Sequence, residues 1–74
     1  MKKLLMLGGS YFQTHAILKA KEMGLYVITC DYLKNNPGHK YSDEYHNIST
    51  TNKEEVLNLA KRLKIDGILA YASD

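Results

Sequence analysis

A chain of 74 residues is expected to form one small domain, since a length of this order buries only about 60–65% of the surface that the unfolded chain exposes. Hydrophobic residues make up 45% of the sequence and charged residues 24%, which is typical of a folded globular protein and excludes a disordered one. The 10 basic and 8 acidic residues are scattered and leave a net charge of +2, so the chain has no basic stripe for nucleic acid or a membrane surface.

The N-terminal segment places positive charge before a short apolar run. Lys2 and Lys3 precede Leu4–Leu7, but this run ends at Gly8 and is too short for the core of a signal peptide. Nothing in the sequence approaches a transmembrane length. The single Cys30 has no partner, so a disulfide framework and a four-ligand zinc site are both excluded within the chain. We therefore expect a cytoplasmic, reducing location.

The first apolar run stops at two glycines and a serine, which predicts a buried strand followed by a turn into a helix. Residues 10–13, Ser-Tyr-Phe-Gln, fit a capping box in which the Ser10 hydroxyl accepts the amide of Gln13 and the Gln13 side chain returns to the Ser10 amide. A helix is expected from Ser10, with Gly24 as its left-handed stop. Its predicted apolar face comprises Phe12, Ala16, Ile17, Ala20 and Met23.

The middle of the chain predicts a second strand, a loop and a peripheral strand. Residues 25–30 form a short apolar run rich in β-branched side chains, and Asp31 closes it. Residues 32–44 lose the apolar rhythm, and the Asn-Asn-Pro-Gly sequence at 35–38 indicates a surface loop. Residues 45–48 are more polar and predict a short third strand at the periphery of the sheet.

The last third of the chain predicts a second helix and a fourth strand. Thr51 and Glu54 fit another capping box, with acidic residues in the first turn and basic residues near the end of the helix. The expected inward face comprises Val56, Leu57, Ala60 and Leu63. Residues 65–67 form a turn into a fourth strand at 68–72, which ends at Ser73 and Asp74.

This succession of elements predicts an α/β fold: a three-layer, open parallel sheet of about four strands in the order 3-2-1-4, with helices on both faces, similar to a Rossmann unit. The strand order reverses between the first and fourth strands. Ligands of open α/β sheets bind at such a switch point, beyond the carboxyl ends of the strands. The residues expected to contact a substrate there are Gly8, Gly9, Ser10, Asp31, Ser73 and Asp74.

The glycine turn has two readings, either an anion site on backbone amides at a helix N-terminus or a tight turn alone. Residues 8–13 read Gly-Gly-Ser-Tyr-Phe-Gln and lack the second and third glycines of the dinucleotide fingerprint, which argues against a nicotinamide or flavin site. Asp31 lies 23 residues after Gly8, close to the spacing of a ribose-binding acid, although an aspartate closing a strand is also common.

Other reactive residue types have structural explanations. His15, His39 and His46 show no ligand spacing, so we expect solvated histidines and no metal site. Cys30 lies inside an apolar run, which favours packing over nucleophilic chemistry. The 6 tyrosines do not alternate on one face, so packing accounts for them better than base stacking does.

The order and spacing of several short segments together carry a family resemblance. In chain order they are Leu-Gly-Gly-Ser at 7–10, Ala-Lys-Glu-Met-Gly-Leu-Tyr-Val-Ile at 20–28, Asp-Tyr at 31–32, Asn-Pro-Gly at 36–38, Tyr-Ser-Asp-Glu at 41–44, Ser-Thr-Thr-Asn-Lys-Glu at 49–54, Lys-Ile-Asp-Gly-Ile-Leu at 64–69 and Tyr-Ala-Ser-Asp at 71–74. Over its whole length the chain resembles the N-terminal, pre-ATP-grasp domain of ATP-grasp ligases, and the carbamoyl-phosphate-synthase-like members in particular.

The resemblance implies a substrate-side domain, covering residues 1–74, of a longer ATP-dependent carboxylate-amine ligase. It carries over Gly8, Gly9 and Ser10 as substrate contacts, with Asp31 and Asp74 at the border of the site. ATP, Mg²⁺ and the catalytic groups belong to later domains of such enzymes, so this part alone is expected to be inactive and to hold no cofactor. Its implied partners are a small-molecule substrate and those later domains, and a homo-oligomer of the parent is compatible with it.

Two further hypotheses come from other functional classes. One is a free-standing nucleotide- or dinucleotide-binding module with a Rossmann-like fold. The other is a domain that serves only for assembly and pairs through an exposed edge strand.

Overall fold

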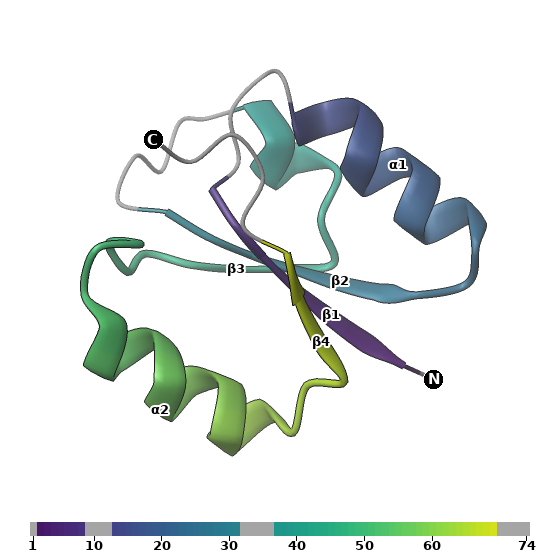
Figure 1. The fold of residues 1–74 in the computed structure, drawn as a ribbon. Coiled ribbons are helices and arrows are strands. Elements are labelled where there is room, and N and C mark those ends of the chain that lie inside the picture. Colours follow the sequence, from purple (N-terminus) through teal and green to yellow (C-terminus); the bar gives the residue numbers. More distant parts are fainter. Residues whose placement is uncertain (1, 9–12, 32–36, 70–74) are drawn as a thin grey trace.

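A computed structural model of the chain describes residues 2–8, 13–31 and 37–69. The elements, in chain order, are β1 (Lys3–Leu7), α1 (Thr14–Glu22), β2 (Tyr26–Cys30), the 3₁₀ helix η2 (Pro37–Lys40), β3 (Glu44–His46), α2 (Lys53–Leu63) and β4 (Gly67–Leu69). The strands form one parallel sheet in the order β3-β2-β1-β4, which confirms the predicted α/β class and strand order (Figure 1). No helix among the described residues is long and apolar enough to cross a membrane.

The central strands β1 and β2 are buried on both faces of the sheet, with α1 on one face and α2 on the other (Figure 1). Successive strand residues point to opposite faces, so Leu5 packs on the α2 side and Met6 on the α1 side. This explains why the first strand is an uninterrupted apolar run. The buried core residues are Leu5, Ile28, Cys30, Val56 and Leu59 on the α2 side, and Met6, Ile17, Ala20 and Val27 on the α1 side.

Helix α1 spans Thr14–Glu22, with Gln13 at its N-cap, and the helix start predicted at Ser10 lies outside the described residues. The Gln13 Nε2 donates to the Leu7 carbonyl oxygen at 2.8 Å, because this buried amide satisfies the acceptor left at the end of β1. Ser10 and Phe12 lie outside the described residues. The predicted stop is confirmed: Gly24 has φ +82° and follows the last turn of the helix.

Helix α2 uses Asn52 as its N-cap, one residue later than the Thr51 that the capping-box pattern predicted. The Asn52 Oδ1 accepts the Glu55 amide at 3.2 Å, and the Asn52 Nδ2 donates to the Glu55 carboxylate at 2.7 Å. The Thr51 hydroxyl is instead hydrogen-bonded to the Ser49 hydroxyl at 2.7 Å. Competition between neighbouring polar side chains therefore shifted the cap.

Two predicted core positions are wrong. Met23 is 69% exposed, because it lies at the C-cap of α1, past the last turn that covers the sheet. Leu57 is 53% exposed, whereas Leu59, which the sequence reading left out, is buried. Val56 and Leu59 are spaced by three residues and face the sheet together, which turns Leu57 toward the flank of the helix.

The segment after the second strand is more ordered than the predicted surface loop, because η2 packs against α1 and Gly38 is buried. The Asp43 carboxylate accepts the Val27 amide at 2.8 Å, and the Asp43 amide donates to the Val27 carbonyl at 2.8 Å. These bonds precede the pairing of β3 with β2, and the third strand starts at Glu44, one residue earlier than predicted. Ile48, which was predicted to lie in this strand, follows it and packs against the core. Residues 35–36 of the expected turn and 70–72 of the fourth strand lie outside the described residues.

Candidate functional site

The parallel sheet brings Gly8 and Asp31 to the same edge, at the carboxyl ends of β1 and β2. The Gly8 amide donates to the Cys30 carbonyl oxygen at 2.7 Å, so the turn after β1 lies directly beside the end of β2. This edge is where an open α/β sheet binds its ligands. The other expected contacts, Gly9, Ser10, Ser73 and Asp74, lie outside the described residues.

Position 8 requires a glycine because of its backbone conformation and because the Gln13 side chain lies beside it. Its φ of +101° lies in a region that favours glycine, and a Cβ at this position would lie 2.8 Å from Oε1 and 2.9 Å from Nε2 of Gln13. Its amide is already used in the bond to the Cys30 carbonyl. Gly8 therefore shapes the turn, and the expected anion contact through the Gly8 amide does not fit this geometry.

Gln13 is a site residue that the sequence reading missed in this role. Its side chain is 2% exposed, packs against Gly8 and donates to the Leu7 carbonyl. The amide thus ties the last residue of β1 to the start of α1. The sequence carried a signal for this role. Gln13 stands at a helix start, where the first backbone amides lack partners within the helix, and it follows a strand whose last carbonyl also needs a hydrogen-bond donor.

Asp31 is a buried carboxylate at the end of β2, and its backbone is held by β3. Its amide donates to the His46 carbonyl at 3.3 Å, and its carbonyl accepts the Tyr45 hydroxyl at 3.0 Å. The Tyr45 hydroxyl in turn accepts the Asn47 amide group at 2.9 Å. These bonds fix the backbone that presents Asp31 at the edge of the sheet.

Cys30 is a packing residue, as the sequence predicted. The side chain is fully buried and its thiol donates to the Ile48 carbonyl at 3.2 Å. Burial, together with the negative charge of Asp31, raises the pKa of the thiol to about 11. The thiol is therefore protonated at neutral pH and is not a nucleophile.

A polar network links Thr29 of β2 to η2 and to the segment that leads into β3. The Thr29 Oγ1 lies 2.8 Å from His39 Nδ1 and donates to the Ser42 hydroxyl at 3.0 Å. Because the threonine hydroxyl has one proton, and that proton goes to Ser42, we assign the proton of the first bond to His39 Nδ1. The ring of His39 also stacks on Tyr45 with centroids 3.8 Å apart.

The prediction of solvated histidines holds for His15, which is exposed, and is wrong for His39 and His46. His46 pairs with the Glu44 carboxylate, which also accepts the Tyr26 hydroxyl at 2.9 Å. The hydrogen bond from His46 lowers the pKa of Glu44, and the bond to Glu44 raises the pKa of Tyr26. Within the described ranges, no group of three or more His, Cys, Asp or Glu could hold a metal ion.

The chain is similar to known enzymes in sequence and in structure. No family model matches the chain. A formate-dependent phosphoribosylglycinamide formyltransferase from Prochlorococcus marinus (strain MIT 9515) is 29% identical over 68 residues, which are 92% of this chain and 17% of that protein. The crystal structure of N5-carboxyaminoimidazole ribonucleotide synthetase from Thermotoga maritima matches with a TM-score of 0.75 and 32% identity, over 84% of this chain and 17% of that one.

Both of these enzymes are ATP-grasp ligases, and the matched part is their N-terminal region. The chain is a homologue of the N-terminal region of ATP-grasp ligases. This confirms the resemblance to ATP-grasp ligases that the sequence segments indicated, and the four-stranded sheet matches the N-terminal domain of such an enzyme. The chain spans 17% of the length of each relative.

Proposed function

We propose that residues 1–74 form the substrate-side N-terminal domain of an ATP-dependent carboxylate-amine ligase of the ATP-grasp superfamily, carbamoyl-phosphate-synthase-like in its architecture. The observation that carries the proposal is the match to the T. maritima synthetase, where 32% identity accompanies a TM-score of 0.75. The parent would bind ATP and Mg²⁺ in its later domains, and this domain alone would lack ligase activity. A cytoplasmic location suits the buried, unpaired thiol of Cys30.

The substrate site proposed here is the carboxyl edge of the sheet. Both relatives are named for phosphoribosyl compounds, a phosphoribosylglycinamide and an aminoimidazole ribonucleotide. An anionic phosphate suits the turn formed by Gly8, Gly9 and Ser10, because the positive end of the α1 dipole lies just beyond it. A ribose hydroxyl suits the Asp31 carboxylate at the neighbouring strand end. Ser73 and Asp74, which follow the fourth strand, would face the same ligand.

We assign different roles to the residues of this turn. Gly8 supplies the positive φ and donates its amide to β2, so amides after it are the donors for a bound anion. Gln13 ties the start of α1 to the end of β1, the two elements that flank these donors in the sequence.

Titration of the ¹⁵N-labelled chain with ribose 5-phosphate, NAD and ATP tests the proposal. We expect saturable amide shifts with ribose 5-phosphate at Gly8, Thr14 and Asp31. Saturable NAD binding at the same amides, without a response to ribose 5-phosphate, would contradict the proposal and support a free-standing dinucleotide-binding module.

A further inference from the structure

Asp31 is the first residue beyond β2, and both of its peptide groups are bonded to β3. The Asp31 amide donates to the His46 carbonyl at 3.3 Å, a bond between backbones. The Asp31 carbonyl accepts the Tyr45 hydroxyl at 3.0 Å, so its partner is a side chain. When both peptide groups of a residue are held, the two dihedral angles between them are restricted, and so is the direction of its Cα–Cβ bond. Tyr45 therefore helps to set where Asp31 presents its carboxylate.

The Tyr45 side chain is itself held by contacts from other segments. Its ring stacks on the ring of His39, with centroids 3.8 Å apart and 31° between the planes. His39 is anchored to the sheet, because its Nδ1 lies 2.8 Å from the Oγ1 of the fully buried Thr29. The Asn47 side-chain amide donates to the Tyr45 hydroxyl at 2.9 Å, so the one proton of that hydroxyl is directed at the Asp31 carbonyl.

We propose that Tyr45 is a positioning residue that gives the site its preference for a ribose phosphate over inorganic phosphate. The inference rests on the proposed function, in which Asp31 binds a ribose hydroxyl and the glycine turn binds the phosphate. Tyr45 acts through Asp31 and does not touch the ligand. A hydrogen bond weakens steeply as its angle departs from linearity, so a carboxylate that loses its orientation binds the ribose less well. The backbone amides that bind the phosphate do not depend on Tyr45.

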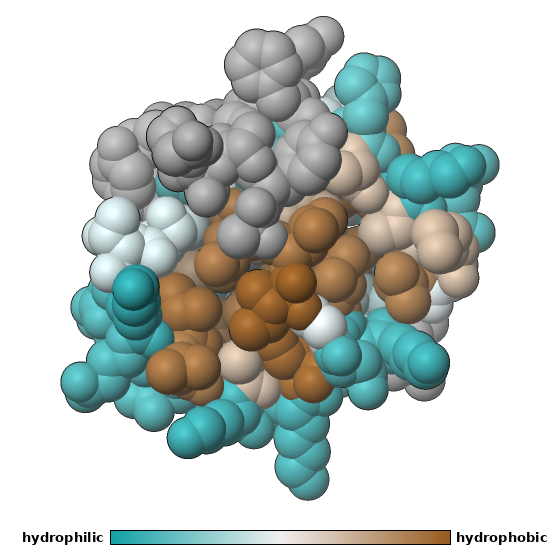
Figure 2. Space-filling model, in the orientation of Figure 1, coloured by the Kyte–Doolittle hydropathy of each residue, from teal (hydrophilic) through white to brown (hydrophobic). Residues whose placement is uncertain are grey.

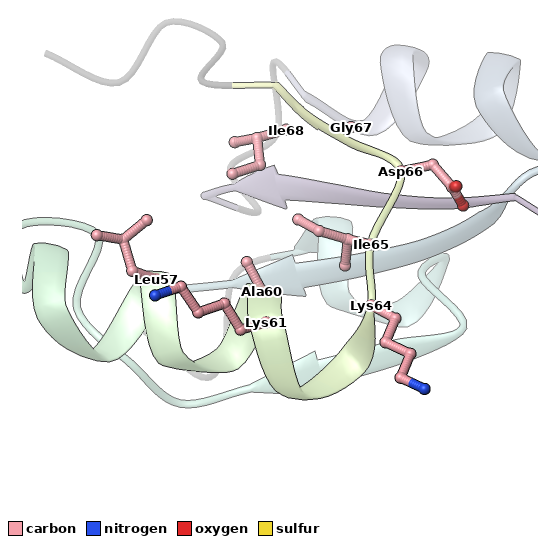
Figure 3. A pocket seen from close by; sticks show the side chains of 8 residues that line it. All are labelled: Leu57, Ala60, Lys61, Lys64, Ile65, Asp66, Gly67 and Ile68. Atoms are coloured by element: carbon pink, nitrogen blue, oxygen red, sulfur yellow. The ribbon is translucent and has the colours of Figure 1, made fainter.

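An open groove of about 410 Å³ between β4 and α2 is a second place where a phosphate could be held by charge (Figure 3). Lys61 and Lys64 line it, and lysine binds phosphate as a point charge. Figure 2 shows hydrophobic residues gathered over this part of the molecule, with hydrophilic residues around them. The apolar residues that line the groove are Leu57, Ala60, Ile65 and Ile68. A test of Tyr45 must therefore separate binding at these lysines from binding at the carboxyl edge of the sheet.

Dissociation constants of ribose 5-phosphate and of inorganic phosphate, from amide shifts of the ¹⁵N-labelled chain, test the proposal. Tyr45→Phe removes the hydroxyl and keeps the ring that stacks on His39. We expect this variant to bind ribose 5-phosphate more weakly by a factor of about three to ten, the order of one hydrogen bond, and to bind inorganic phosphate as the wild type does.

Tyr41→Phe is the matched control, because the same atom is removed from an exposed tyrosine of the same segment. Both dissociation constants should equal those of the wild type. Lys61→Ala combined with Lys64→Ala should also leave both unchanged. Loss of both ligands in this double variant would place the phosphate in the groove and refute the proposed substrate site.

The ratio of the two affinities decides between positioning and a purely structural role. An equal loss of affinity for both ligands in Tyr45→Phe would overturn the proposal, and so would unchanged affinity for both. Ribose 5-phosphate binding by the wild type with the same ratio in Tyr45→Phe would refute this inference alone. A wild type that binds inorganic phosphate and ribose 5-phosphate equally well, or neither, would refute the proposed function.

Hydrogen exchange tests the same bond without a ligand. The Asp31 amide should exchange faster in Tyr45→Phe than in the wild type and in Tyr41→Phe, because the released carbonyl lets the end of β2 open locally. Equal exchange rates in the three proteins would overturn the positioning role of Tyr45.

Discussion

Replacing Gly8 with alanine should destabilise the fold because two costs coincide at this residue. A non-glycine residue at φ +101° is strained, at about 1–3 kcal/mol. The new Cβ would also lie 2.8 Å from Gln13 Oε1, so the glutamine must move and release the Leu7 carbonyl, at a further cost of about 1–3 kcal/mol. The sum, about 2–6 kcal/mol, is a large part of the roughly 4–11 kcal/mol expected for a domain of this length.

Urea unfolding of the wild type, Gly8→Ala, Gln13→Ala and the double variant measures both costs. The double variant removes the side chain that the new Cβ would strike, so the two changes should be less than additive by about 1–2 kcal/mol. Gly67→Ala is the matched control, because its new Cβ meets only the Leu4 side chain at 3.8 Å. If Gly8→Ala unfolded at the wild-type urea midpoint, the requirement for glycine at the positive φ of position 8 would be refuted.

Three further substitutions test local features of the fold. Asn52→Ala should cost about 1 kcal/mol in urea unfolding and Thr51→Ala less, because Asn52 is the helix cap; the reverse ranking would restore the capping-box reading. Thr29→Val should lower the free energy of unfolding by about 1–3 kcal/mol, and an unchanged value would show that its buried hydroxyl bonds contribute nothing net. His46 lowers the pKa of Glu44 below its ordinary 4.5, so ionised Glu44 stabilises the fold above that pH and the contribution is lost as pH falls through the lowered value. The stability difference between wild type and Glu44→Gln should therefore shrink during acid titration, and a difference independent of pH would contradict the assignment.

The sheet could be predicted from the sequence because its signals are local. Short apolar runs bounded by turn residues predicted β1 and β2, and the spacing of the elements predicted the order β3-β2-β1-β4. Gly24 was found as the stop of α1 because left-handed backbone strongly favours glycine. These features depend on neighbours in the chain and leave few alternatives.

The errors arose where distant or competing contacts decide the outcome. His39 binds Thr29, ten residues away, and no spacing rule indicates that bond. Leu57 fits a helical stripe almost as well as Leu59 does, and only the placement of α2 on the sheet separates the two. The sequence correctly placed Gly8 and Asp31 at the carboxyl edge of the sheet, but it did not show that the Gly8 amide is used in the sheet or that Gln13 bonds the end of β1.

The central claim is that the glycine turn binds the phosphate of an acceptor substrate. The most direct measurement compares the dissociation constants of ribose 5-phosphate for the wild type, Gly9→Val and Gly67→Ala, from amide shifts under identical salt. We predict weaker binding in Gly9→Val, by a factor on the order of ten, because the side chain blocks approach to the backbone amides, and unchanged binding in Gly67→Ala. Equal affinity in Gly9→Val and the wild type would contradict the account.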